Sequence, residues 1–349
     1  MKKKISLISV LGGFAILLAG ALVISSCEGP QGPAGTDGKD GTDGTNGVDG
    51  NVTCLACHSE GNMEAIQQQF AGSQHSSGAI AVDYAGGRAS CTKCHSHEGF
   101  VAFAAGLADQ DIANPSAWEC GTCHGLHVTF EEDDYALRLS DAISFIFDET
   151  VTADFANGNL CVNCHQSRRA EPNVSDPGET FEISSTHYGP HHGAQGNVLY
   201  GAGMAEIPGD IAYPAPGSAA HMDLSCTGCH MGEFDVEENA GGHTYWPTVG
   251  SCTSCHSGLE DFDYNGAQTE VEALLVELRD ILLAQGVLTG DEEHGYHPVN
   301  ERDNPGEATF SMVQAQEFFN WIGLEEDRSL GVHNPNYVMA LLKNTIAAL

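Results

Sequence analysis

The sequence that decides the fold reads HMDLSCTGCH from 221 to 230, continues with GGHT at 241–244 and closes with CTSCH at 252–256. It holds two Cys-x-x-Cys-His units, and each unit places two thiols and one imidazole within about one turn of chain. A covalently attached c-type haem needs this set of groups, because the thiols bond to the porphyrin vinyl groups and the imidazole binds one face of the iron. His221 and His243 are additional histidines that can serve the other face.

The same unit occurs six times along the chain, and we number the motifs and their sites 1 to 6 in chain order. The motifs use twelve of the thirteen cysteines, in the pairs Cys54 and Cys57, Cys91 and Cys94, Cys120 and Cys123, Cys161 and Cys164, Cys226 and Cys229, and Cys252 and Cys255. The histidines that directly follow the pairs are His58, His95, His124, His165, His230 and His256. We predict six haem c groups, with these cysteines as attachment points and these histidines as proximal iron ligands.

Two other uses of paired cysteines fit the sequence less well. Zinc sites also contain Cys-x-x-Cys pairs, but four ligands per ion would couple the pairs two by two and would not require a histidine after each pair. A disulfide scaffold would accept any residue after the second cysteine. A histidine after all six pairs therefore favours haem attachment.

The first residues predict export and membrane attachment. Three lysines precede an apolar run from Ile5 to Ile24, which is typical of a secretion signal, here residues 1–26. The junction Ile24-Ser-Ser-Cys27 resembles the lipobox of bacterial lipoproteins, so Cys27 is the predicted lipidation site and accounts for the thirteenth cysteine. An uncleaved anchor helix is the alternative, and both place the body of the protein outside the cytoplasm.

Residues 27–50 form a linker in which glycine occupies every third position from Gly29 to Gly50. The period is that of collagen, where only glycine fits the crowded axis of three chains. The run is short and its other positions are rich in Asp and Asn. We predict an extended stalk between the lipid anchor and the haem region, with weak trimerisation as the alternative.

Composition and the spacing of apolar residues divide the remaining chain into two parts. We predict a hexahaem region, residues 51–260, and a C-terminal helical cover, residues 261–349. The first part is rich in Gly, Ser, Asn and Asp and has few long periodic segments, whereas the second carries apolar side chains at helical spacing. The helices that we predict cover Met63–Ala71, Asp141–Phe147, Gln268–Leu288, Phe310–Ile322 and Pro335–Ile346. Asn334 before Pro335 is typical of a helix start.

Eleven further histidines are available as distal iron ligands, and several stand in contexts that resemble multihaem c-type cytochromes. The resemblance covers about residues 51–349 and is closest to cytochrome c554-like and other hexahaem or octahaem electron-transfer cytochromes. The contexts are Ser73-Gln-His75, the Cys-x-x-Cys-His-x-x-His run that ends at His127, the loop 186–193, His221 before motif 5, Gly241-Gly-His243 and Gly331-Val-His333.

The resemblance implies a mainly α fold with extensive irregular loops, little β structure and haems ligated by two histidines each. The distal ligands it implies are His75, His127, His187, His221, His243 and His333, with His191 or His192 in place of His187 if the 186–193 loop folds differently. His97 is too close to His95 to reach the opposite face of the same haem. We expect His294 and His297 to be exposed to solvent.

The formal net charge of −35 bears on partners. A strongly acidic surface repels nucleic acid and favours redox partners, such as other cytochromes, with basic docking surfaces. We predict an exported outer-membrane lipoprotein, facing the periplasm or the cell surface, that transfers electrons and has no catalytic residues of its own, either alone or as a homo-oligomer or filament. The alternative is an oxidoreductase that acts on a small nitrogen or sulfur compound at one open haem, but no Cys-x-x-Cys-Lys motif supports it.

Overall fold

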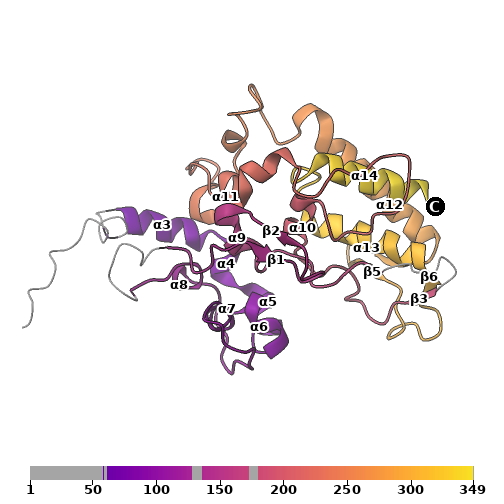
Figure 1. The fold of residues 1–349 in the computed structure, drawn as a ribbon, viewed down its shortest axis with the longest axis horizontal. Coiled ribbons are helices and arrows are strands. Elements are labelled where there is room, and N and C mark those ends of the chain that lie inside the picture. Colours follow the sequence, from indigo (N-terminus) through magenta and orange to yellow (C-terminus); the bar gives the residue numbers. More distant parts are fainter. Residues whose placement is uncertain (1–57, 59–60, 128–135, 173–179, 349) are drawn as a thin grey trace, which may run out of the picture. The chain divides into compact units, whose positions relative to one another are not determined.

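Helices and irregular loops make up most of the chain that the computed structural model describes, namely residues 58, 61–127, 136–172 and 180–348 (Figure 1). These residues belong to one compact unit, Gly50–Leu349. The mainly helical fold with many loops confirms the predicted fold class. Outside the described residues lie the predicted signal 1–26, Cys27, the linker 27–50, Cys54 and Cys57.

Short helices follow one another in the part of the chain that contains motifs 1 to 3. They are α3 (Asn62–Ala71), α4 (Gln74–Ser77), α5 (Ala79–Ala85), α6 (Ala89–His95), α7 (His97–Ala104) and α8 (Cys120–Cys123). Two of them begin at a serine whose hydroxyl accepts a backbone N–H: Ser73 Oγ from Ser76 N at 3.2 Å, and Ser96 Oγ from Gly99 N at 3.1 Å. The helix α3 confirms the prediction for Met63–Ala71.

The middle of the chain has short helical turns joined by loops. They are η2 (Ala156–Gly158), α9 (Asn159–Val162), α10 (Gln195–Tyr200), η3 (Ala220–Asp223), α11 (Ser225–His230), η4 (Gly242–Thr244), η5 (Val249–Ser251) and η6 (Tyr264–Gly266). A small apolar cluster surrounds α9, with Phe145, Phe155 and Val162 at its centre. The cluster touches Cys226, so motif 4 and motif 5 share this packing.

Three long helices form the main apolar core, α12 (Ala267–Ala284), α13 (Met312–Asp327) and α14 (Pro335–Ala347). They contact one another pairwise and lie together in Figure 1. Two have strong starts: Ser311 and Gln314 form a capping box on α13, and Asn334 Oδ1 accepts Tyr337 N on α14. All three predicted C-terminal helices are confirmed, with bounds shifted by a few residues. None of the helices in the described ranges is both long and apolar enough to cross a membrane.

Strands are few in the described chain and form three antiparallel pairs. The pairs are β1 (Ile143–Ser144) with β2 (Thr152–Ala153), β3 (Thr180–Glu182) with β6 (Thr309–Ser311), and β4 (Leu288–Asp291) with β5 (Gly295–Pro298). The predicted helix Asp141–Phe147 is wrong, because this segment contains β1 instead. Ile143 and Phe145 are buried while Ser144 between them is exposed, and this period of two suits a strand rather than a helix.

Candidate functional site

In motifs 2 to 6 the Cys-x-x-Cys-His residues lie in short helices or turns. Residues three and four apart in a helical turn are neighbours, so the two cysteines and the histidine of such a motif lie close together. In three motifs the backbone N–H of the histidine donates a hydrogen bond to the backbone carbonyl of the first cysteine at 2.9 Å. These bonds run from His124 to Cys120, from His165 to Cys161 and from His256 to Cys252. The cysteines among the described residues are all free thiols, so they are available for thioether bonds.

Each of the six motif histidines faces one other histidine from a distant part of the sequence. The ring centroids are between 6.0 and 6.4 Å apart in every pair. The pairs, from site 1 to site 6, are His58 with His127, His95 with His191, His124 with His243, His165 with His75, His230 with His333, and His256 with His221. The pairing is one to one, and no histidine belongs to two pairs.

This spacing matches two imidazoles that bind one metal ion from opposite sides. With a metal–nitrogen bond of about 2 Å on each side, the centroids of two such rings are separated by about 6 Å. The six separations are therefore compatible with an iron ion between the two rings of each pair.

Among the contacts of the described residues, four of these twelve histidines use the Nδ1 atom as a hydrogen-bond donor to an oxygen. Nδ1 of His165 donates to Gln195 Oε1 at 3.2 Å, and Nδ1 of His230 to the carbonyl of Tyr245 at 2.8 Å. Because the proton lies on Nδ1, the lone pair of Nε2 is free to bind iron.

The two other donors belong to the distal set and meet at one loop. Nδ1 of His221 donates to the carbonyl of Val332 at 2.6 Å, and Nδ1 of His333 to Asp327 Oδ1 at 2.7 Å. Val332 and His333 are adjacent in the loop between α13 and α14. This loop therefore contributes to orienting the predicted distal histidines of both site 5 and site 6.

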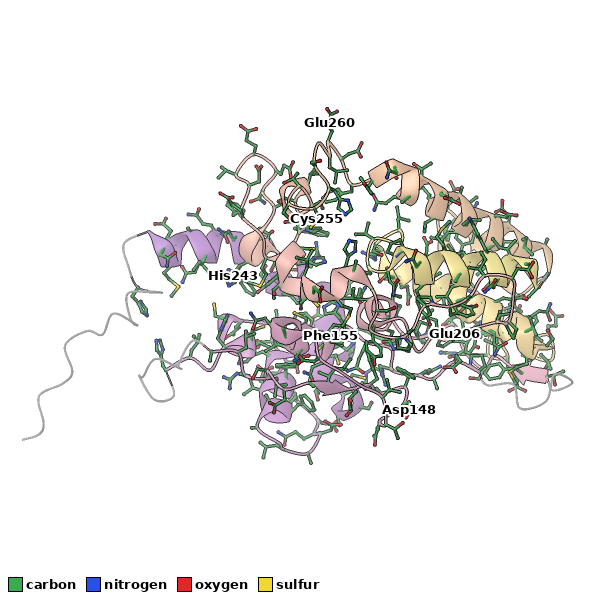
Figure 2. The ribbon with its side chains drawn as sticks, turned by 45° about the horizontal axis from the view of Figure 1, so that its top comes forward. Asp148, Phe155, Glu206, His243, Cys255 and Glu260 are labelled. Atoms are coloured by element: carbon green, nitrogen blue, oxygen red, sulfur yellow. The ribbon has the colours of Figure 1, made fainter. Side chains whose placement is uncertain are left out.

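Local structure fixes His243 and His75, the predicted distal histidines of sites 3 and 4. His243 lies on η4 (Figure 2), and its backbone N–H donates to Gln69 Oε1 on α3 at 3.1 Å. His75 lies on α4, and its ring meets the edges of Trp118 and Tyr245 with centroids 5.4 and 5.1 Å apart. These contacts limit the rotation of each imidazole.

The loop 186–193 places its three histidines differently from the first choice of the sequence analysis. His191 faces His95, whereas His187 lies beside Tyr84 with ring centroids 6.5 Å apart. His192 Nδ1 contacts Glu326 Oε1 at 2.5 Å and is not paired with a motif histidine. The structure places six of the eight distal candidates named above beside motif histidines, with the alternative His191 in place of the first choice His187.

The backbone explains why this loop could not be read from sequence. His191 and His192 both have positive φ, +73° and +32°, a region that non-glycine residues seldom adopt. Such conformations persist where the surrounding structure imposes them, often at functional positions. No periodicity or motif in the sequence separates the three histidines.

The motifs contact one another in a continuous series. Thr122 in motif 3 hydrogen-bonds His97, just after motif 2, at 2.7 Å between Oγ1 and Nδ1. Motifs 2 and 4 exchange two contacts, since Cys94 Sγ lies 4.0 Å from the carbonyl of Asn163 and Cys164 Sγ lies 3.8 Å from that of Lys93.

The series continues from motif 4 to motif 6. The hydroxyl of Ser225, beside motif 5, donates to the carbonyl of Phe155 just before α9. Ser251, beside motif 6, donates to the carbonyl of Cys229 at 3.2 Å. With His127 joining site 1 to the end of motif 3, these contacts connect the sites in the order 1, 3, 2, 4, 5, 6. Motif 3 also lies near motif 4, because Cys123 is close enough to Cys161 and Cys164 to contribute to the raised pKa of both thiols.

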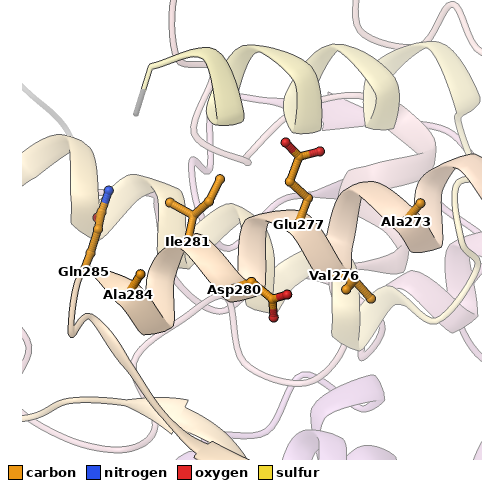
Figure 3. Close-up of a pocket in the computed structure, with 7 residues that line it drawn as sticks. All are labelled: Ala273, Val276, Glu277, Asp280, Ile281, Ala284 and Gln285. Atoms are coloured by element: carbon orange, nitrogen blue, oxygen red, sulfur yellow. The ribbon is translucent and has the colours of Figure 1, made fainter.

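The described chain also has two concave features. A shallow groove along α12 is lined by Ala273, Val276, Glu277, Asp280, Ile281, Ala284 and Gln285, and it has no histidine or cysteine (Figure 3). A small cavity of about 110 Å³ lies beside His191 and is lined in part by His187, His192 and His297. Within the described ranges, no group of three or more His, Cys, Asp or Glu side chains is arranged to hold a bare metal ion.

Comparison with known proteins agrees with the fold. No family model and no curated protein matches the sequence. Among solved structures, the chain is similar to the crystal structure of the outer cell wall cytochrome OcwA, with a TM-score of 0.50 and 16% sequence identity. The similarity covers 80% of this chain and 49% of that one, so the chain spans about half the length of OcwA. The fold therefore resembles that of a cytochrome.

Proposed function

We propose that this protein is an exported hexahaem c-type cytochrome that transfers electrons through six haems with two histidine ligands each. The observation that carries the proposal is the one-to-one pairing of all six motif histidines with a second histidine at 6.0 to 6.4 Å. When bound, haem iron supplies one-electron chemistry by alternating between its ferric and ferrous states.

The residues of the chain determine how that chemistry is used. Twelve cysteines would hold the haems covalently, and the twelve paired histidines would supply two ligands to each iron, which would exclude substrates from it. The order of contacts between motifs, 1, 3, 2, 4, 5, 6, arranges the six sites in a continuous series. Electrons can therefore cross the protein in single steps between neighbouring sites, with no need for a bound substrate.

Arg168 has a supporting role at site 2 in this proposal. Its Nη1 lies 3.3 Å from His191 Nε2, the nitrogen that would bind iron. Arginine binds carboxylates with two parallel hydrogen bonds, so Arg168 would pair with a propionate of a haem held at site 2.

The place of the protein in the cell follows from its first residues and its charge. We propose a lipid anchor at Cys27, an extended stalk over residues 27–50 and a haem unit held away from the outer membrane. The name of OcwA describes an outer cell wall cytochrome, which is consistent with a cell-surface location for this chain too. With a net charge of −35, its partners are redox proteins with basic docking surfaces.

The filament form of the proposal does not depend on shared ligands. All six motif histidines have a partner within the same chain, so a neighbouring copy is not required to complete any site. If the protein assembles, contact between sites of neighbouring copies is the mode we expect.

Electron transfer can be distinguished from the alternative, an oxidoreductase with one open haem, by two assays on the same preparation. Dithionite-reduced protein mixed with ferric citrate should reoxidise at all six haems. With reduced viologen as donor, nitrite, hydroxylamine and tetrathionate should be consumed no faster than by heat-denatured protein. Sustained turnover of any of these compounds by the native protein would overturn the proposal in favour of the enzyme.

A further inference from the structure

Asp327, the last residue of α13, lies directly behind the distal histidine of site 5. Its Oδ1 accepts the hydrogen bond from His333 Nδ1 at 2.7 Å, and its side chain is only 1% exposed. The hydroxyl of Ser329 donates to the other carboxylate oxygen, Oδ2. The carboxylate is thus shielded from water and is held by two hydrogen bonds.

The three comparable histidines meet a different kind of acceptor. His165 donates to the side-chain amide of Gln195, His221 to the carbonyl of Val332, and His230 to the carbonyl of Tyr245. These oxygens belong to neutral groups, whereas the acceptor for His333 is the carboxylate of Asp327. Since His230 is the proximal ligand of site 5, this haem has one axial histidine on a neutral acceptor and one on a carboxylate.

We propose that Asp327 is a positioning residue that lowers the reduction potential of haem 5 through His333. A hydrogen bond from Nδ1–H to a carboxylate gives the imidazole part of the character of an imidazolate and makes it a stronger electron donor to the iron. A stronger axial donor and a nearby buried negative charge both stabilise ferric over ferrous iron. The inference rests on the proposed ligation of site 5 by His230 and His333.

The position of site 5 in the series gives this effect a consequence. Site 5 stands between sites 4 and 6. A low reduction potential at site 5 therefore makes electron transfer from site 4 to site 5 energetically uphill. Electrons from sites 1 to 4 would reach haem 6 only through a transiently reduced haem 5. Asp327 would in this way control electron exchange between haem 6 and the other five haems.

The test is a spectroelectrochemical titration of Asp327→Asn holoprotein beside the wild type, with haem content and low-temperature EPR measured on the same samples. Asparagine keeps the shape and a neutral acceptor but removes the charge. We expect one of the six reduction steps to shift upward and one low-spin ferric signal to change its g values, with all six haems retained.

Asp291→Asn is the matched control, because Asp291 also hydrogen-bonds a histidine, His294 Nδ1, at 2.8 Å. That pair is exposed and His294 has no motif partner, so the six potentials should stay unchanged. A shift of the same size in this control would mean that the titration reports surface charge, and it would overturn the inference.

Ser329→Ala is a second variant, which keeps the carboxylate of Asp327. It tests the effect of Asp327 on the reduction potential of haem 5 if Asp327→Asn does not fold. Without the hydroxyl donor, more negative charge is available to His333, so the same step should shift downward. If six low-spin haems are present and neither variant moves a potential in the expected direction, the role of Asp327 is wrong while the proposed function stands. A wild-type protein without six low-spin haems would instead overturn the proposed function itself.

Discussion

Replacing His191 by alanine is expected to convert one of the six haems from low spin to high spin, whereas His187→Ala should leave all six low spin. The two histidines lie in the same loop, and the sequence context alone favoured His187. In the structure His191 faces His95 with ring centroids 6.2 Å apart, and His187 lies beside Tyr84 instead. Low-temperature EPR and the high-spin absorption band near the red end of the spectrum measure the outcome.

His187→Ala is the matched control for this prediction, since it removes an imidazole from the same loop without touching a proposed ligand. The reduced His191→Ala protein should also bind carbon monoxide at one haem, because the vacated axial position is open. A high-spin haem in His187→Ala and none in His191→Ala would contradict the ligand set and restore His187 as the distal ligand of site 2.

Loss of haem 4 should damage the protein far more than loss of haem 6. The double change Cys161→Ser and Cys164→Ser removes the covalent attachment at the site where motifs 2, 4 and 5 meet, beside the apolar cluster of Phe145, Phe155 and Val162. Because cofactor binding contributes directly to folding free energy, we expect the melting temperature to fall by about 10 °C or more.

The corresponding change at motif 6, Cys252→Ser with Cys255→Ser, is the control. Cys255 is exposed, and motif 6 has only motif 5 as a neighbour in the series. This variant should lose one haem by mass spectrometry with a melting temperature close to that of the wild type. Equal destabilisation by the two variants would contradict the central place of site 4.

The sequence predicted the helical parts of the fold where local signals are strong. Asn334 followed by Pro335 marked the start of α14, and apolar spacing marked α12. The helix predicted for Asp141–Phe147 was wrong. Its few residues are compatible with the spacing of either a helix or a strand, and burial of alternate residues against α9 favours the strand β1. The pairing of β3 with β6 joins residues more than a hundred positions apart, and no local pattern encodes it.

The candidate site likewise has a part that local sequence predicts and a part that depends on the fold. The attachment cysteines and proximal histidines are local, because each haem needs them within one Cys-x-x-Cys-His turn. The partner of each histidine is a long-range property: His221 stands just before motif 5 yet faces His256 of motif 6. His127 likewise follows motif 3 but faces His58 of motif 1. Sequence context can select residues that act as distal ligands, but only the fold decides which haem each would serve.

The most direct test of six haems with two histidine ligands each is low-temperature EPR of the oxidised wild-type protein, with haem content quantified by pyridine haemochrome and intact mass in the same sample. The account predicts six covalent haems per chain and low-spin ferric signals that integrate to all six. Fewer than six haems, or a high-spin signal equal to one haem or more, would contradict it.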